Sequence, residues 1–288
     1  MSNEKRDTMS LLTSSFGCAV GVLNGGPIAG RIDELSSVGI EWIEPQFSRL
    51  DAFDAEDETF LRESRRRISD AGLRVWSVHS PFGKEVDISS DDKGIRERGI
   101  AGIKRAILGC AALGGRIVVA HMSDNLPKGG DRAVYLGIAR KSIDQIVEVA
   151  RDNGIQIAIE NLLPNFLGES AEELLSVVDS YPPETVGVCL DTGHANVKAG
   201  GDPEKAVAIA RALANRIITT HLHDNDGSGD LHQVPGFGNI DWCEMSKTLA
   251  ESTYDGPLMF EVTGPGSHEE AISRLPEATS TIRKHMEN

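Results

Sequence analysis

Short apolar runs rich in β-branched residues alternate along the chain with longer segments whose apolar positions recur at helical spacing. A short run of this kind, bounded by Gly, Pro or polar turn residues, is typical of a buried strand. The pattern predicts eight strands, at Ser15–Val20, Ile40–Pro45, Leu73–His79, Arg116–His121, Ile155–Glu160, Thr185–Asp191, Ile217–His221 and Pro257–Glu261.

A helical segment follows each strand candidate. Ser170 opens a Ser-Ala-Glu-Glu capping box, and Asp202 precedes Pro203 at a first helical position, so both residues mark helix starts. The predicted helices lie near 28–38, 54–71, 92–113 and 131–152 and begin near 170, 202, 241 and 267. Strands that alternate with helices form parallel sheets.

This alternation predicts a single-domain (β/α)₈ TIM barrel. A barrel of about 250 residues with extensions would use the whole chain of 288 residues. We expect a flexible tail over residues 1–12 and the barrel over 13–288. An open doubly wound sheet is the alternative, but the first strand-to-helix turn lacks the phosphate-binding fingerprint of that fold.

Metal-ligand side chains stand at or just beyond the ends of most predicted strands. A single His at a strand end is more often a core residue than a ligand, but here the pattern recurs from strand to strand. In a (β/α)₈ barrel all the carboxyl ends meet at one mouth. The recurring tips therefore predict a metal site formed by Glu160, Asp191, His221 and Glu261.

This carboxylate-rich set suits Mn²⁺, Zn²⁺ or Mg²⁺. Up to three ions are conceivable from the sequence, because His79 and His121 can share Glu160 with a second ion. A third would be held by His194, Asp230 and His232.

Strand alternation suggests three contacts to a substrate. His223 points to the same side of its strand as His221, and Trp42 has the same parity as Glu44 at the tip of the second strand. We expect Glu44, His223 and Trp42 to line the pocket.

The composition narrows the partners. With 29 basic and 44 acidic residues the net charge is −15, which disfavours binding to nucleic acid. The four cysteines show no paired spacing, so neither a disulfide framework nor a thiolate zinc site is expected. No signal peptide or membrane-length apolar run is evident, and a cytoplasmic location is expected. The sequence leaves open whether the protein forms a homo-oligomer.

Three stretches resemble one family. They are Leu190-Asp191-Thr192-Gly193-His194, His221-Leu222-His223-Asp224-Asn225 and the run from Pro235 to Trp242, Pro-Gly-Phe-Gly-Asn-Ile-Asp-Trp. The chain resembles the xylose isomerase-like TIM barrels, which include sugar epimerases of the D-tagatose 3-epimerase type, related isomerases and dehydratases, and endonuclease IV. The last run is similar to the sugar-isomerase branch.

The resemblance implies a metal-dependent isomerase or epimerase acting on a small carbohydrate through an enediolate. Glu160 and Glu261 match the acid/base pair of that branch, and with Asp191 and His221 they match the ligands of its single metal. The match at His194 implies a contact to the substrate or to a ligand.

One departure leaves alternatives open. The epimerases carry an Arg in the loop after the seventh strand, whereas residues 222–240 contain no Arg or Lys, so ketohexose 3-epimerisation in particular is not implied. Asp230-Leu231-His232 instead resembles a pattern of endonuclease IV, and all nine ligand positions of that three-zinc phosphodiesterase have a counterpart here. A zinc phosphodiesterase for abasic DNA, a sugar or keto-acid dehydratase, and a non-catalytic sugar-binding barrel are the alternatives.

Overall fold

The structure is a computed structural model, and it describes residues 15–20, 32–47, 58–124, 126, 129–264 and 266–287. The predicted tail over 1–12 and the starts of the first two predicted helices lie outside these residues. Within the described part of the chain, no helix is both long and apolar enough to cross a membrane.

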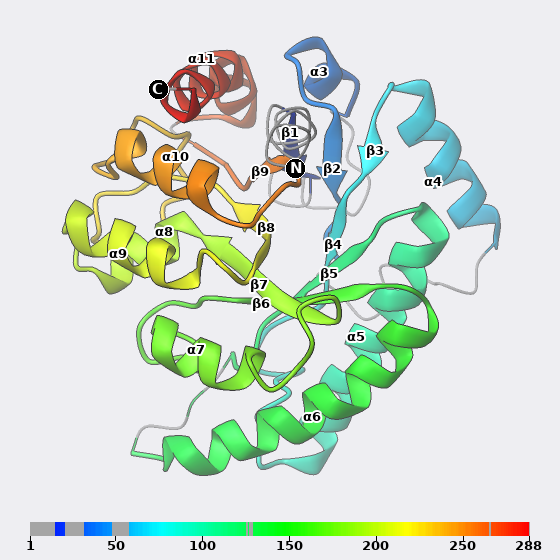
Figure 1. The fold of residues 1–288 in the computed structure, drawn as a ribbon. Helices are drawn as coiled ribbons and strands as arrows, with labels where there is room; N and C mark the ends of the chain where they lie inside the picture. Colours follow the sequence, from blue (N-terminus) through cyan, green and yellow to red (C-terminus); the bar gives the residue numbers. More distant parts are fainter. Residues whose placement is uncertain are drawn as a thin grey trace, which may run out of the picture.

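The strands form a parallel barrel, as predicted (Figure 1). One sheet has the order β3-β2-β1-β9 and the other the order β4-β5-β6-β7-β8. Parallel bridges from Gln46 to His79 and from Leu222 to Phe260 join the two sheets and close the barrel. The strands are β1 Phe16–Ala19, β2 Trp42–Glu44, β3 Arg74–Val75, β4 Ser77–His79, β5 Ile117–Ala120, β6 Gln156–Glu160, β7 Val186–Asp191, β8 Ile217–His221 and β9 Leu258–Phe260.

The third predicted strand is divided at Trp76 into β3 and β4. Its backbone still joins both neighbours, because the Trp76 N–H donates to the Ile43 carbonyl at 3.1 Å and the Trp76 carbonyl accepts from the Arg116 N–H at 3.0 Å. β3 pairs with β2 and β4 pairs with β5, so this segment connects the two sheets of the barrel.

Helices surround the strands on the outside (Figure 1). They are α3 Ile32–Ser37, α4 Glu58–Asp70, α5 Lys93–Leu113, α6 Arg132–Asp152, α7 Ala171–Val178, α8 Thr192–Lys198, α9 Pro203–Leu213, α10 Trp242–Glu251 and α11 His268–Met286. Ser170 and Asp202 cap α7 and α9, as their positions predict.

The short helix α8 departs from the sequence prediction, which has none between β7 and α9. It begins directly after β7 because the Asp191 carboxylate accepts the backbone N–H of His194 and so caps the first turn. The residue predicted as a metal ligand is thus also a helix cap.

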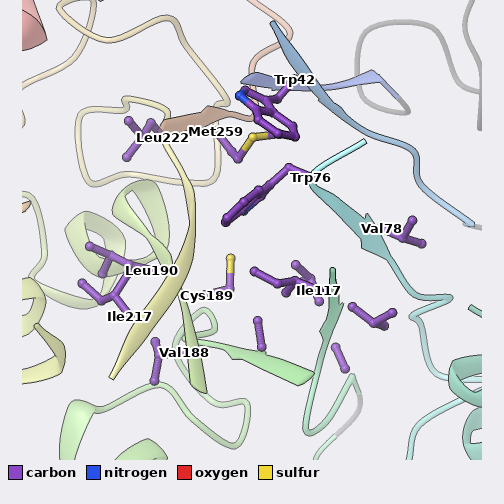
Figure 2. Close-up of a cluster of buried hydrophobic side chains, with 14 of the residues drawn as sticks. Trp42, Trp76, Val78, Ile117, Val188, Cys189, Leu190, Ile217, Leu222 and Met259 are labelled. Carbon is purple, nitrogen blue, oxygen red and sulfur yellow. The ribbon is translucent and has the colours of Figure 1, made fainter. Parts of the chain in front are cut away.

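Apolar side chains fill the amino-terminal end of the barrel. Trp42 packs edge-on against Trp76, with ring centroids 5.5 Å apart, and Met259 lies beside them (Figure 2). Gly17 leaves the space that this layer needs, because a Cβ at that position would lie 2.1 Å from the Met259 sulfur. The polar strand tips therefore lie above a packed apolar layer.

Candidate metal centre

Four side chains from four separate segments converge at the carboxyl end of the barrel. Glu160 ends β6, Asp191 ends β7, His221 ends β8 and Glu261 follows β9, and all four are buried. One ligand atom from each lies within 4.8 Å of the others. Ligands on opposite sides of an ion bound at about 2.1 Å lie about 4.2 Å apart, so a small contraction would fit this set to one divalent cation.

His221 is central to this group. Its Nδ1 lies 3.1 Å from Glu160 Oε1, 3.2 Å from Glu261 Oε2 and 4.0 Å from Asp191 Oδ2. Its Nε2 faces away and lies 2.8 Å from Glu44 Oε1. A carboxylate on Nε2 favours the tautomer that carries its proton there, which leaves the Nδ1 lone pair directed at the other three side chains.

Glu44 therefore lies behind His221. It is fully buried, and its second oxygen accepts the Ser77 hydroxyl at 2.5 Å. Sequence parity placed Glu44 against a substrate, but both of its oxygens already have protein partners. Its position suits orientation of the imidazole better than contact with a ligand.

A second group adjoins Glu160. His79 Nε2 and His121 Nε2 lie 3.3 and 3.2 Å from the same Glu160 oxygen, Oε2. The other ring nitrogens are held by acceptors, since His79 Nδ1 lies 2.8 Å from the Ser80 carbonyl and His121 Nδ1 lies 2.7 Å from Asp124. Both rings can thus present an unprotonated Nε2 to one point.

The third group depends on the segment after β8. A hairpin-like bridge between Asp224 and Gln233 turns the chain back, which brings Asp230 and His232 over the barrel mouth. Asp230 Oδ2 lies 3.0 Å from His232 Nε2 and 3.5 Å from His194 Nε2. His232 adopts a φ of 45°, which is uncommon for a non-glycine residue.

His223 links the first and third groups. Its Nε2 lies 3.0 Å from Asp191, and its ring stacks on His232 with centroids 4.3 Å apart. The Gly in the Asp191-Thr192-Gly193-His194 stretch makes room for it, because a Cβ on Gly193 would meet the His223 ring at 1.9 Å.

In the protein alone, protons on the imidazoles balance the negative charges of the carboxylates. Burial by itself would raise the pKa of Glu160, but His221, His121 and His79 hold that pKa well below its usual range. Burial disfavours the charged ring of His121, yet Asp124 and Glu160 raise its pKa to about 10. A bound cation would therefore displace protons from the imidazoles.

Trp42 is the predicted site residue that the structure keeps apart from this cluster. It lies at the start of β2, packs against Trp76, and its indole N–H donates to the Ser15 hydroxyl at 3.3 Å. Strand parity places Trp42 and Glu44 on the same side of the strand. A distance of two residues along the strand is nevertheless enough to put Trp42 in the packed apolar layer and Glu44 beside the metal-ligand cluster.

Sequence reasoning missed the residues that hold the ligands. Asn161 accepts the Asp191 N–H and donates to the Asp191 carbonyl, both at 2.8 Å, and its own carbonyl lies 2.9 Å from His194 Nδ1. The His-x-x-Asp spacing from 121 to 124 indicates Asp124 as a partner of His121. Nothing in the sequence indicates Asn161 except its position directly after Glu160.

Asp224 holds the segment from Pro235 to Trp242 in place. Its carboxylate accepts the Gly236 N–H at 2.9 Å and the Trp242 indole N–H at 2.7 Å, and it is fully buried. Trp242 is therefore fixed beneath the loop.

Comparisons with known proteins agree with this architecture. The uncharacterised protein MJ1311 of Methanocaldococcus jannaschii is 34% identical over 189 residues, 64% of this chain and 63% of its own length. A D-psicose 3-epimerase of Agrobacterium fabrum is 25% identical over 236 residues, which cover 80% of this chain and 77% of that protein.

Among solved structures, a D-tagatose 3-epimerase-like protein superposes with a TM-score of 0.79 at 24% identity, over 94% of this chain and 98% of that one. The family model described as xylose isomerase-like TIM barrel matches residues 32–284. The chain therefore belongs to the xylose isomerase-like TIM barrel family.

Proposed function

We propose that this protein is a divalent-metal-dependent isomerase or epimerase that moves a proton on a small polyhydroxy carbonyl compound through an enediolate. The observation that carries the proposal is the convergence of Glu160, Asp191, His221 and Glu261 within 4.8 Å at the barrel mouth. Its relatives include proteins named as D-psicose and L-ribulose 3-epimerases.

The donor set fits a divalent cation such as Mn²⁺, Zn²⁺ or Mg²⁺. When bound, such an ion would polarise the substrate's carbonyl and make the neighbouring C–H more acidic. Glu44 would orient His221, and Asn161 would hold Asp191, so the ligands keep their positions before substrate arrives.

Glu160 and Glu261 would transfer the proton. They come from strands separated by two others, and each places a carboxylate oxygen next to His221 Nδ1. One carboxylate would remove the proton from the carbon beside the carbonyl. Return of a proton by the other carboxylate to the same carbon inverts it, and return to the neighbouring carbon isomerises the sugar.

Hydrogen exchange from carbon tests this function. The protein, stripped with a chelator and reloaded with Mn²⁺, is incubated in D₂O with a panel of ketoses and aldoses, and NMR follows loss of the proton beside the carbonyl. We expect hydrogen exchange with at least one sugar. This exchange should disappear when the metal is chelated and return when the metal is added back. Absence of exchange across the panel by the reloaded protein contradicts the proposal, and mass loss of one water identifies a dehydratase instead.

The geometry of the two outer groups favours a second candidate, a multinuclear phosphodiesterase for abasic DNA. His79 and His121 direct Nε2 to one Glu160 oxygen, and His194 and His232 direct Nε2 to Asp230. Against it stands the net charge of −15, which repels a polyphosphate.

Metal stoichiometry and an abasic oligonucleotide separate the two candidates. One tightly held ion per chain and no strand cleavage would favour proton transfer. Three ions per chain with cleavage at the abasic site would favour the phosphodiesterase.

A further inference from the structure

A cavity of about 200 Å³ opens beside the metal-ligand cluster, and its lining is both polar and apolar. The polar lining residues are His121, Ser123, Asp124, His194 and Asp230. The apolar lining residues, called here the apolar wall, are Phe82, Leu162, Leu163 and Phe166.

The apolar wall begins next to the cluster. The Phe82 ring lies 4.7 Å from the His121 ring and 5.0 Å from the His79 ring, centroid to centroid. Both of these imidazoles contact Glu160. His121 also lines the cavity, so a small molecule that reaches from the carboxylates past His121 can contact the wall.

The loop that carries most of the wall is held in place. Asn165 adopts a φ of 77°, and its N–H donates to Glu169 at 2.5 Å. The Phe166 carbonyl accepts from Arg132 at 2.7 Å, and the Leu167 N–H donates to the Ser123 hydroxyl at 2.9 Å. Asn is among the non-glycine residues that adopt this conformation most readily, and the hydrogen bonds around it hold the loop in place.

Two of the polar residues that line the cavity already have protein partners. Ser123 is buried with its oxygen already accepting a backbone N–H, and Asp124 is engaged with His121. The described residues that line the cavity include no Lys or Arg. A hydroxyl or phosphate held against these four apolar side chains would lose water, and the side chains offer it no hydrogen bond.

We propose that the substrate is a deoxy-sugar, whose carbonyl end reaches the carboxylate cluster and whose other end is a methyl group seated against Phe82 and Phe166. This inference rests on the proposed function and adds the substrate class. The methyl group gains apolar burial, whereas the hydroxymethyl group of the parent sugar must be desolvated there.

Matched substrates test the inference. Several ketohexoses, each with its 6-deoxy and 6-phosphate counterpart, are compared by carbon-bound hydrogen exchange in D₂O with the metal-loaded full chain. We expect kcat/KM for the 6-deoxy compound to exceed that of its parent by about 10- to 100-fold. The 6-phosphate should show no exchange.

Variants locate the preference. Phe82→Ala and Phe166→Ala should raise KM for the 6-deoxy sugar and reduce its preference over the parent to less than about threefold. Phe237→Ala is the control, because Phe237 and Phe82 are each 39% exposed but Phe237 does not line this cavity. It should leave the preference unchanged.

The outcomes separate this inference from the proposed function. Exchange with none of the sugars overturns the proposed function and the inference with it. Exchange at equal or higher kcat/KM with the parent or the phosphate overturns the inference alone. A deoxy preference that survives both wall variants also overturns it, because the wall would then not be its source.

Discussion

The two ends of the barrel interior are equally buried and chemically opposite. At the amino end Trp42, Trp76 and Met259 pack together, and at the carboxyl end Glu261 and His221 are enclosed to a similar degree. Neighbouring positions of one segment supply both layers, since Trp42 and Glu44 are two residues apart, and so are Met259 and Glu261. Burial of the apolar layer stabilises the fold, whereas desolvation of carboxylates opposes folding. Degree of burial alone therefore does not distinguish core from site, and the chemistry of the buried groups must decide.

The largest effect should come from the polar layer. Glu261→Gln removes a proton-transfer group while keeping its shape, so kcat for hydrogen exchange should fall by about 10²- to 10⁴-fold with the circular-dichroism spectrum unchanged. The control is Glu251→Gln, at an exposed position on α10. Turnover retained by the Glu261 variant would remove the acid/base role.

The apolar layer should show the reverse behaviour. Trp76→Ala should lower the free energy of unfolding in urea by about 3–5 kcal/mol, because it leaves a cavity in a packed layer. The kcat of the protein that remains folded should stay within about threefold. Val134→Ala, 54% exposed on α6, should change stability by less than about 0.5 kcal/mol. Loss of activity without loss of stability at Trp76 would break the contrast between the layers.

Glu44 lies where the two layers meet, so its variants sharpen the boundary. Glu44→Gln should weaken metal affinity about 10-fold and Glu44→Ala about 100-fold, because the outer nitrogen of His221 loses its carboxylate partner. Competition with a chromophoric chelator measures the affinity. Unchanged affinity in both variants would place Glu44 with the structural layer.

The smallest effect concerns a carboxylate outside the barrel. Burial alone would raise the pKa of Glu173, but Arg132 and the Gly168 N–H lower it. A folded-state pKa below the usual value of about 4.3 adds stability above that pH, and this stability is lost as pH falls through the lowered pKa.

The free energies of unfolding of wild type and Glu173→Gln should therefore differ by about 1 kcal/mol at pH 6 and converge towards pH 3. Urea titrations at the two pH values measure this. A difference that is independent of pH would assign the effect to packing.

Much of the fold could be predicted from the sequence because most strands end at or just before a polar residue. The β-branched run before Glu160 and the Asp202-Pro203 helix start predicted their elements directly. Convergence of the tips followed from barrel closure, since parallel strands bring their carboxyl ends to one mouth.

Other features depend on contacts between distant segments. His221, the imidazole partner of Glu44, is 177 residues away in the sequence, and strand parity does not reveal this contact. The helix after β7 is absent from the sequence prediction because Asp191 is interpreted there only as a ligand, although Asp is a common helix cap. The left-handed turn at Asn165 is enforced by Glu169 and its neighbours.

The position of β9 between β8 and β1 has a consequence for synthesis. Glu261 belongs to the last part of the barrel to leave the ribosome, so a nascent chain halted before Leu258 would hold Glu160, Asp191 and His221 without the fourth ligand. It would also leave β1 and β8 with open edges, which invite association with other chains. The four-ligand cluster can therefore assemble only after β9 has been synthesised.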